Sequence, residues 1–350
     1  MSMNATSSAD GRIRPTRHEV TLAGRPIRWP TFLAPMSGIT DLPFRRLALR
    51  FGADVVVTEM VASDALAVGD VDATVRLAGE GVGTHVVQIA GREPAATARA
   101  AAMAVDAGAD VIDLNMGCPA KRVCQGWSGS ALMRDLDTAV AIIRAVKAEI
   151  AVPLTLKMRL GWSRDTMNAA ELARRAEVEG VELVTVHGRT RDQFYEGSAD
   201  WAAVRPVAEA IALPLVVNGD IDGTASAEAA LAASGADGVM IGRAACGRPW
   251  LVGEVARALR GETAVAPPTG TALGELVVEH YEAMLAHHGP KVGLKAARKH
   301  LSWYAEAMEA ADAVAVPAPL RRTMLTSLQP AEVIGAVRAI YSGDVERRAA

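Results

Sequence analysis

The clearest signal in this chain is the segment Val111-Ile112-Asp113-Leu114-Asn115-Met116-Gly117-Cys118-Pro119. It begins as an apolar run of the kind that forms a buried strand, and it then turns polar within a few residues. Apolar runs of the same kind recur along the chain, and each ends in a polar or glycine-rich turn. This pattern predicts a barrel of parallel strands whose carboxyl ends carry the chemistry. A thiol at such an end makes Cys118 a candidate catalytic group.

The predicted strands alternate with segments of helical pattern. The strands are Thr31–Met36, Asp54–Thr58, Thr84–Ile89, Val111–Asn115, Pro153–Met158, Leu183–His187, Pro214–Asn218 and Gly238–Ile241. Most are continuous apolar runs, as expected of strands that are buried on both faces. Alanine-rich helical patterns lie between them, for example at Ala95–Ala107 and Asp137–Ala148. This order favours a (β/α)8 TIM barrel over residues 19–260; a doubly wound sheet usually has fewer strands.

The regularity changes after a predicted helix at Trp250–Arg260. Residues 261–270 contain Pro267-Pro268 and show no periodicity, which is typical of a linker. Helical patterns follow near 271–288, 291–309, 317–327 and 331–341. We therefore expect residues 271–350 to form a small all-helical domain behind the barrel.

Composition limits the class of protein. The chain has 350 residues, half of them hydrophobic, and a formal net charge of −3, so nucleic-acid binding would need a local basic face. Its three cysteines form no CxxC pair, which predicts a reducing, cytoplasmic location and neither a disulfide framework nor a metal site. No apolar stretch is long enough to span a bilayer. Residues 1–18 are polar, which predicts a disordered tail rather than a signal peptide. We expect a monomer.

Polar residues and glycines gather at the predicted carboxyl ends of the strands, the face on which barrel enzymes build their active sites. They are Pro35 and Met36 after the first strand, Gln88 after the third, Asn115 and Cys118 after the fourth, Lys157 after the fifth, His187 and Arg189 after the sixth, Asn218, Gly219 and Asp220 after the seventh, and Gly242 and Arg243 after the eighth. Glycine-containing loops after strands seven and eight form the usual phosphate site of such barrels. Together these two turns favour a bound phosphate over two ordinary tight turns.

Three of these side chains have a structural alternative beside the functional one. Lys157 could stabilise an anionic cofactor ring, or it could form a buried ion pair with a neighbour such as Glu59. Gln88 has the donor and acceptor that suit the edge of a heterocycle, but a bond to backbone at the barrel rim is the more common arrangement. His187 could bind a phosphate or a substrate carbonyl, although a lone histidine at a strand end is more often structural.

Cys118 could be a small buried apolar residue, but the Gly-Cys-Pro turn favours a thiol that points outward. An unperturbed thiol is mostly protonated at neutral pH, so it can act as a general acid as well as a nucleophile. Cys124 and Cys246 have no comparable surroundings, and we interpret both as structural.

The chain resembles the tRNA-dihydrouridine synthase family over roughly residues 30–340. The matching segments are Leu33-Ala34-Pro35-Met36 with Thr40-Asp41, Gln88-Ile89-Ala90-Gly91, Asp113-Leu114-Asn115-Met116-Gly117-Cys118-Pro119, Lys157-Met158-Arg159, Val186-His187-Gly188-Arg189-Thr190, Asn218-Gly219-Asp220-Ile221 and Gly242-Arg243. They occur in order and at plausible spacing. The most specific of them is Asn-Met-Gly-Cys-Pro, followed by Lys121.

The resemblance implies a barrel that binds flavin mononucleotide (FMN), followed by a helical domain that binds RNA. In this family NADPH reduces FMN, the flavin passes a hydride to C6 of a uridine in tRNA, and a cysteine protonates C5. Carried onto this chain, Cys118 is that acid, and Asn115 and Arg189 contact the substrate. The residues implied to line or hold the flavin are Pro35, Met36, Gln88, Lys157, His187, Asn218, Gly219, Asp220, Gly242 and Arg243.

A basic stripe in the second predicted C-terminal helix agrees with an RNA partner. Its members are Lys291, Lys295, Arg298 and Lys299. At about 100° per residue they fall near one face and an apolar set falls on another, with no acidic residue between Met284 and Tyr304. A solvated basic face is the common alternative, but the resemblance favours contact with the RNA backbone. Lys121 would extend this surface to the barrel mouth.

Two other functions stay open on the sequence alone. The same barrel could use FMN to reduce a free pyrimidine or an enone, and the chain could be a non-catalytic RNA-binding protein. The basic stripe argues against the first, and the concentration of polar groups at the strand ends argues against the second.

Overall fold

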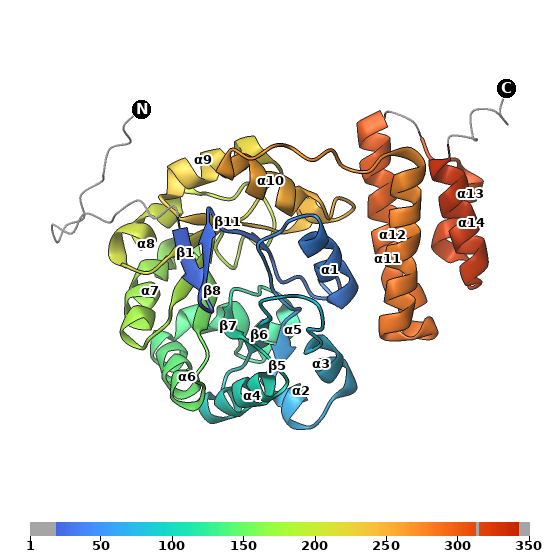
Figure 1. The fold of residues 1–350 in the computed structure, drawn as a ribbon. Helices are drawn as coiled ribbons and strands as arrows, with labels where there is room; N and C mark the ends of the chain where they lie inside the picture. Colours follow the sequence, from blue (N-terminus) through green and yellow to red (C-terminus); the bar gives the residue numbers. More distant parts are fainter. Residues whose placement is uncertain (1–18, 313–314, 343–350) are drawn as a thin grey trace.

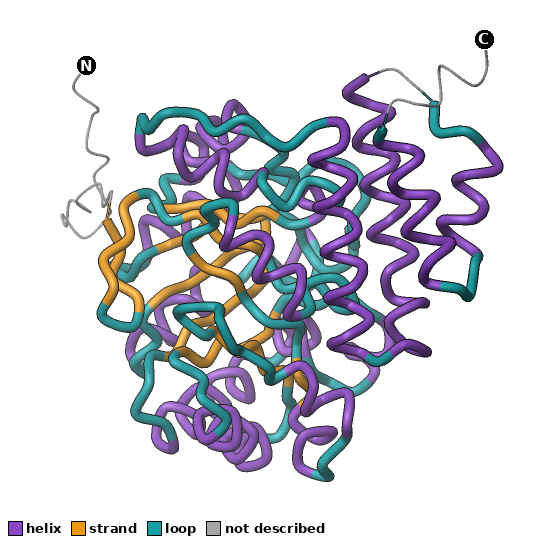
Figure 2. The backbone as a smooth tube through the Cα atoms, turned by 45° about the vertical axis from the view of Figure 1, so that its right-hand side comes forward, coloured by secondary structure: helices purple, strands orange, loops and turns teal. Residues whose placement is uncertain are grey.

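A sheet of parallel strands, curled into a barrel with helices around it, forms the centre of the molecule (Figures 1 and 2). The computed structural model describes residues 19–312 and 315–342, and the predicted tail at residues 1–18 lies outside that part of the chain. The strands of the barrel are β3 (Thr31–Leu33), β4 (Val55–Val56), β5 (Val61–Ala62), β6 (Val86–Ala90), β7 (Val111–Met116), β8 (Leu154–Arg159), β9 (Leu183–His187), β10 (Leu215–Asn218) and β11 (Gly238–Ile241). The predicted fold class, a TIM barrel followed by helices, is confirmed.

The barrel closes through the short segment that joins β4 to β5. In the sheet, the strand order is β4-β3-β11-β10-β9-β8-β7-β6-β5, so these two consecutive strands lie at opposite edges. Between them, the Val57 N–H donates to the Leu33 carbonyl at 3.4 Å and the Thr58 N–H donates to the Val86 carbonyl at 3.1 Å. Residues 55–62 therefore pass from β3 to β6 as one extended segment and join the two edges.

Burial on both faces explains the continuous apolar runs seen in the sequence. Every residue of β7 is buried, as are all but Lys157 in β8. Outside the sheet, the helices are rich in alanine, which lets α4 (Pro94–Asp106) and α6 (Leu136–Glu149) pack closely. The Glu93 carboxylate caps α4 by accepting the Ala96 N–H at 2.7 Å, and Asp135 caps α6 in the same way. Such caps satisfy N–H groups that the first turn leaves unpaired.

The remaining helices of the barrel follow the expected alternation. They are α1 (Leu42–Arg50), α2 (Ser63–Ala67), α3 (Val71–Arg76), α5 (Lys121–Gln125), α7 (Ala169–Val178), α8 (Arg205–Ala210), α9 (Thr224–Ser234) and α10 (Leu251–Arg260). A 3-10 helix, η1 (Gly129–Arg134), follows α5 and packs on β7 and β8. In the part of the chain that the structure describes, no helix is long and apolar enough to cross a membrane.

A hairpin that the sequence analysis did not predict precedes the barrel. Its strands are β1 (Glu19–Leu22) and β2 (Arg25–Arg28), joined by Ala23 and Gly24 with positive φ angles of 47° and 73°. Val20, Leu22 and Ile27 are buried in one cluster with the first residues of several barrel strands. The hairpin therefore covers the amino-terminal end of the barrel, opposite the strand ends that carry polar residues.

Four helices follow the barrel as a separate bundle (Figure 1). They are α11 (Gly270–His288), α12 (Pro290–Asp312), α13 (Ala318–Thr326) and α14 (Pro330–Tyr341). They share a hydrophobic core of their own, which Leu47 of α1 joins from the barrel side. Polar contacts fix the same junction: Arg50 pairs with Glu279 at 2.6 Å, and the His288 ring lies 2.9 Å from the Asp41 carboxylate.

Candidate active site at the carboxyl ends of the barrel strands

A cavity of about 1320 Å³ opens at the carboxyl ends of the strands. Twelve of the side chains and glycines singled out from the sequence line it, and they come from seven different strand ends. These residues are Pro35, Met36, Gln88, Asn115, Cys118, Lys157, His187, Asn218, Gly219, Asp220, Gly242 and Arg243. The topology thus gathers residues that lie more than 200 positions apart in the sequence around one space.

A chain of buried hydrogen bonds leads from the barrel interior to the backbone of Cys118. The Thr155 hydroxyl donates to Asp113 at 2.6 Å, and the Gln88 amide donates to the other oxygen of that carboxylate at 2.7 Å. The Asn115 amide donates to the Gln88 oxygen at 2.7 Å, and the Asn115 oxygen accepts the Cys118 N–H at 2.9 Å. This sequence of bonds fixes both amide side chains, so Gln88 and Asn115 are held in one orientation.

The Cys118 turn is fixed from its other side as well. The Ser130 hydroxyl and N–H both donate to the Cys118 carbonyl, at 2.8 and 3.1 Å. Gly129 has a φ of 61°, and a Cβ there would lie 2.9 Å from that same carbonyl oxygen, so the close approach requires glycine. Burial raises the pKa of the Cys118 thiol above its ordinary value. The thiol therefore stays protonated at neutral pH, the state that a general acid needs.

Lys157 brings a cation into the wall of the cavity. Its ammonium donates to Asn218 Oδ1 at 3.0 Å, and the Asn218 amide in turn donates to the Met240 carbonyl at 2.8 Å. Burial, together with repulsion from Arg159, lowers the pKa of Lys157 to about 8. The structure shows no ion pair with Glu59 among the residues it describes, so that alternative for Lys157 does not apply.

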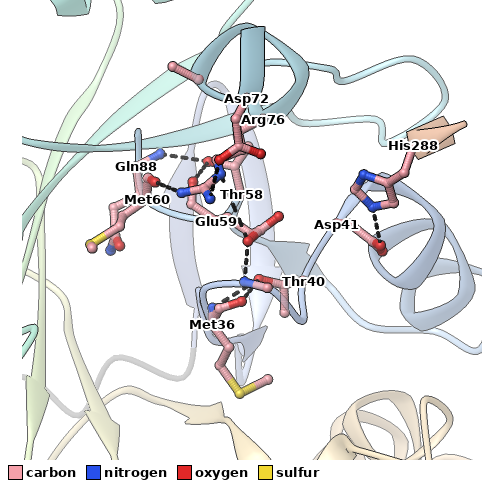
Figure 3. Close-up of polar contacts among 12 residues, drawn as sticks. Met36, Thr40, Asp41, Thr58, Glu59, Met60, Asp72, Arg76, Gln88 and His288 are labelled. Carbon is pink, nitrogen blue, oxygen red and sulfur yellow. Dashed lines mark hydrogen bonds and ion pairs between the residues drawn. The ribbon is translucent and has the colours of Figure 1, made fainter. Parts of the chain in front are cut away.

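Glu59 instead holds the loop that follows β3 (Figure 3). Its carboxylate accepts the Gly38 N–H and lies 4.0 Å from Arg76 Nε. Within the loop, the Met36 N–H donates to the Thr40 hydroxyl at 2.9 Å. These bonds place Pro35 and Met36 against the cavity, as the sequence predicted for the first strand end.

The turn after β10 has a backbone that demands glycine at one position. Gly219 has a φ of 114°, and a Cβ there would lie 2.7 Å from His187 Cδ2. Asp220 follows with a φ of 53°. Burial alone would raise the pKa of Asp220, but hydrogen bonds from Arg189 and the Ala199 N–H, together with the charges of Arg189 and Arg243, outweigh it, and the pKa lies below its ordinary value. Burial and four nearby cations lower the pKa of His187 well below its ordinary value, so this imidazole is neutral.

Arg189 has a different place from the substrate contact that the resemblance implied. Its side chain is 1% exposed and donates to both Asp220 oxygens, at 2.5 and 2.9 Å, and to the carbonyls of Glu196 and Gly197. With its donors turned into the protein, it positions Asp220 rather than reaching into the cavity. Arg243, by contrast, keeps 59% of its side chain exposed beside Asp220.

The basic residues predicted to contact RNA lie outside the cavity. Lys121 begins α5 near its mouth and is exposed, as are Lys291 and Lys295 on α12. Two members of the stripe have contacts inside the protein: Arg298 donates to the Thr326 carbonyl at 3.5 Å, and the Lys299 ammonium lies against Gly38 of the loop after β3. The four basic residues therefore do not form one solvent-exposed stripe: Lys291 and Lys295 face solvent, and Lys299 faces the loop after β3.

Sequence reasoning assigned no role to two residues that organise this site. Asp113 anchors the hydrogen-bond chain, and a lone carboxylate inside an apolar run was the available signal. Arg159 is 1% exposed and donates to the carbonyls of Gly117 and Thr190, at 2.9 and 2.7 Å. It ties the Cys118 turn to the neighbouring loop, a link that only the strand order reveals. Among the described residues, no group of three or more metal-ligating side chains is present.

Comparison with known proteins shows which family the chain resembles. The profile described as dihydrouridine synthase (Dus) matches residues 32–333. A protein named probable tRNA-dihydrouridine synthase from Rhodobacter capsulatus is 49% identical over 92% of this chain and 96% of its own length. One of the same name from Rhizobium leguminosarum bv. phaseoli is 49% identical over 93% and 99%.

Among solved structures, a 2-naphthoyl-CoA reductase complex aligns with 70% of this chain at a TM-score of 0.55 and 12% identity. This chain spans about half of that protein, with 52% covered, so the likeness shows the barrel fold alone. The matches in sequence extend further, from the first barrel strand into the last helix. The chain belongs to the dihydrouridine synthase family.

Proposed function

We propose that this chain reduces specific uridines in tRNA to 5,6-dihydrouridine, with FMN as its cofactor and NADPH as the reductant. The observation that carries the proposal is the position of Cys118, whose backbone Asn115 and Ser130 hold at the wall of a cavity that Lys157 also lines. The relatives named probable tRNA-dihydrouridine synthase, similar over nearly their whole length, support the substrate.

The cavity has the groups that a flavin mononucleotide needs. A Cβ placed on Gly242 would meet only Met36 Sδ at 3.7 Å and Ala34 Cβ at 3.8 Å, so the backbone at the end of β11 is not crowded where it lines the cavity beside exposed Arg243. Backbone N–H groups of such turns and a guanidinium suit a phosphate. Lys157 has one hydrogen-bond partner among the described residues, which leaves donors for an electron-rich ring.

The reaction needs a hydride on one carbon and a proton on the other. FMN held in this cavity beside Lys157 would supply the hydride for C6 of the uracil ring. The Cys118 thiol gives its proton to C5, and its raised pKa keeps that proton available at neutral pH. Asn115 and Ser130 hold the backbone of Cys118 from two sides, which fixes the acid relative to the cavity. Neutral His187 provides a hydrogen-bonding group and adds no further charge to the cations around it.

The RNA-binding surface in this proposal joins two parts of the molecule. Residues 19–260 form the catalytic domain and residues 271–350 a tRNA-binding domain, with 261–270 as the linker. Lys291 and Lys295 face solvent on α12, and Lys299 approaches the loop after β3. A basic face that continues to the barrel mouth suits a polyanion whose modified base enters the cavity. We further propose that the enzyme acts as a cytoplasmic monomer.

Mass spectrometry of nucleosides tests the function. Unmodified tRNA incubated with the purified protein and NADPH should gain dihydrouridine, and tRNA from a deletion strain should lack it at the corresponding positions. Free uracil tested in parallel separates this function from reduction of a free pyrimidine or an enone. A protein that purifies without flavin and leaves tRNA unchanged would instead be a non-catalytic RNA-binding protein.

A further inference from the structure

Arginine and aromatic side chains alternate beside the cavity, in loops whose Gly126, Ser128 and Tyr195 line it. The Arg134 guanidinium lies over the Trp127 ring at 5.1 Å and over the Trp162 ring at 4.9 Å. The Arg191 guanidinium lies over Trp162 at 4.5 Å and over Phe194 at 4.6 Å. These five residues make one continuous stack, which we call the Trp–Arg ladder. At these distances the ring quadrupole attracts the guanidinium, which favours the stacked arrangement of both arginines.

The ladder belongs to the same loops that build the cavity. Trp127 lies between α5 and η1, in the segment whose Ser130 bonds to the Cys118 carbonyl. Arg134 ends η1, Trp162 follows β8, and Arg191 and Phe194 follow β9. These strands are neighbours in the sheet, so their carboxyl-end loops form one stretch of the rim. The bundle contacts α1 and the loop after β3 instead, so the ladder lies on another part of the rim.

Two rings of the ladder are held in an unfavourable backbone conformation. Trp127 has a φ of 56° and Phe194 a φ of 48°, in the region that bulky residues rarely adopt. Trp127 is nevertheless 56% exposed, so burial of its ring does not account for the strain. Strain of this kind concentrates at sites that bind ligands. The exposed Trp127 side chain lies beside the Arg134 guanidinium, 5.1 Å from its ring centroid.

We propose that the Trp–Arg ladder binds unpaired nucleotides of the substrate RNA next to the target uridine. An exposed indole can stack on any nucleobase, whatever the RNA sequence. A planar guanidinium beside it suits the phosphate of the same nucleotide. A uridine that enters the cavity must leave its own stack, and its neighbours then need another surface. The proposal rests on tRNA being the substrate. In it, Trp127 stacks on a nucleobase and Arg134 binds a phosphate.

Affinity for unmodified tRNA tests the ladder. Loss of one stacked base corresponds to a 5- to 150-fold weaker Kd, roughly, and we expect this for Trp127→Ala, with Trp127→Phe recovering part of it. Since Trp127→Ala removes no charge, the slope of log affinity against log salt should stay as in the wild type. Arg134→Ala should weaken binding and make that slope less steep by about 0.7–0.9. Flavin content and the rate of flavin reduction by NADPH should stay unchanged in all three.

A matched control and a modified substrate complete the experiment. Trp29 also has a positive φ, of 51°, but it precedes β3 at the opposite end of the barrel, so Trp29→Ala should leave tRNA affinity unchanged. Abasic nucleotides on both sides of the target uridine should weaken wild-type binding and have little further effect on Trp127→Ala. The proposal would be overturned if Trp127→Ala and Arg134→Ala both bound tRNA as tightly as the wild-type protein. It would also be overturned if a lower unfolding temperature were the only change in these variants. Wild-type protein that does not bind tRNA at all would overturn the proposed function before any variant is compared.

Discussion

The thiol of Cys118 and the ammonium of Lys157 line one cavity. For the proposed reaction the thiol must stay neutral, whereas the ammonium must stay charged. Burial disfavours the charged form of each group, so it raises the pKa of the thiol and lowers the pKa of the ammonium. The thiol gains from this as an acid, because it keeps its proton at neutral pH. The ammonium keeps its charge only below a pKa of about 8, so the same burial limits the pH range in which it attracts an anion.

Replacement of Cys118 by alanine should separate the two halves of the reaction. We expect Cys118→Ala to keep its flavin and its reduction by NADPH, because the thiol serves the substrate and not the cofactor. Re-oxidation of the reduced flavin by unmodified tRNA should slow by about 10²–10⁴-fold, the usual loss when a general acid is removed. Stopped-flow absorbance of the flavin measures both rates.

The matched control for this variant is Cys246→Ala. Cys246 is also partly buried and has a raised pKa, but it does not line the cavity. Both half-reactions should therefore proceed at the wild-type rate in Cys246→Ala. An unchanged rate of tRNA-driven re-oxidation in Cys118→Ala would assign the proton to another group.

Flavin affinity of the cofactor-free protein should depend on the charge of Lys157. Its pKa is lowered to about 8, so the ammonium is charged below that pH and loses its charge as the pH rises through it. We expect the Kd for FMN to increase above pH 8 by at most about tenfold per pH unit, the limit for one linked proton. Lys157→Met should bind FMN weakly at every pH and lose this dependence. Quenching of flavin fluorescence measures the Kd, and the same pH profile in both proteins would contradict the role.

At the scale of helices and strands, the long strands that are buried on both faces could be predicted from the sequence. The half-exposed strands of the hairpin and the two-residue strand β5 could not. Runs such as Val111–Asn115 are apolar throughout because both faces are covered, and composition alone reveals them. The hairpin of β1 and β2 has only a weak alternating pattern, and its turn at Ala23-Gly24 contains one glycine. β5 has two residues and forms only by pairing with β6, which no local signal indicates.

The candidate site divides in the same way. Strand ends on one barrel face were predictable from topology, and the structure brings Cys118, Lys157 and Gly242 to one cavity as expected. The direction of a side chain was not predictable when its partner lies on another strand. Arg189 is turned inward by Asp220, a pairing across 31 positions that the sequence pattern does not encode.

The junction between α1, α11 and α12 contains histidines that sequence reasoning did not consider. His300 is 1% exposed and packs on Phe44 at 5.4 Å between ring centroids, and neither of its ring nitrogens has a hydrogen-bond partner among the described residues. His280 donates to or accepts from the Tyr304 hydroxyl at 3.1 Å. Burial lowers the pKa of His280 to about 4 and that of His300 well below its ordinary value.

Acid should therefore destabilise this junction, and His300→Phe should reduce the effect. Below its ordinary pKa of 6.5, a histidine takes up a proton in the unfolded chain but not in this folded one, so stability is lost as the pH falls. For His300 the loss between pH 7 and pH 5 is at most about 2 kcal/mol, the limit for a group that binds its proton only in the unfolded chain. His300→Phe removes this loss and gives up no hydrogen bond, while His280 keeps its own contribution.

Denaturant unfolding at pH 7 and pH 5 measures this difference. The pair of His288 with Asp41 has the opposite sign: its hydrogen bond raises the pKa of His288, so its contribution is present at low pH and is lost as the pH rises through that pKa. His288→Ala should therefore destabilise the protein more at pH 5 than at pH 8. Equal acid sensitivity of wild type and His300→Phe would show that His300 does not control the junction.

At the scale of the whole molecule, the exposed lysines of α12 and the catalytic groups lie on two different parts of the chain, the bundle and the barrel. The cavity belongs to the barrel, and the exposed lysines Lys291 and Lys295 belong to α12 of the bundle (Figure 1). Charge on the bundle should therefore support tRNA affinity without any effect on flavin chemistry. The net charge of the chain is −3, so attraction to RNA depends on where the cations lie and not on their sum.

Reversal of the charge on α12 tests this separation. We expect Lys291→Glu combined with Lys295→Glu to keep flavin content and NADPH oxidation with small acceptors, because both side chains are exposed and outside the cavity. Affinity for tRNA should fall, and its dependence on salt should become less steep by about 0.7–0.9 for each lost phosphate contact. Arg28→Glu combined with Arg174→Glu changes the net charge equally on β2 and α7, both outside the bundle and the cavity mouth, and should leave the salt slope unchanged. Equal tRNA affinity and an equal slope in the α12 variant would place the RNA surface elsewhere, with Lys121 and Arg122 beside the cavity as the next residues to reverse.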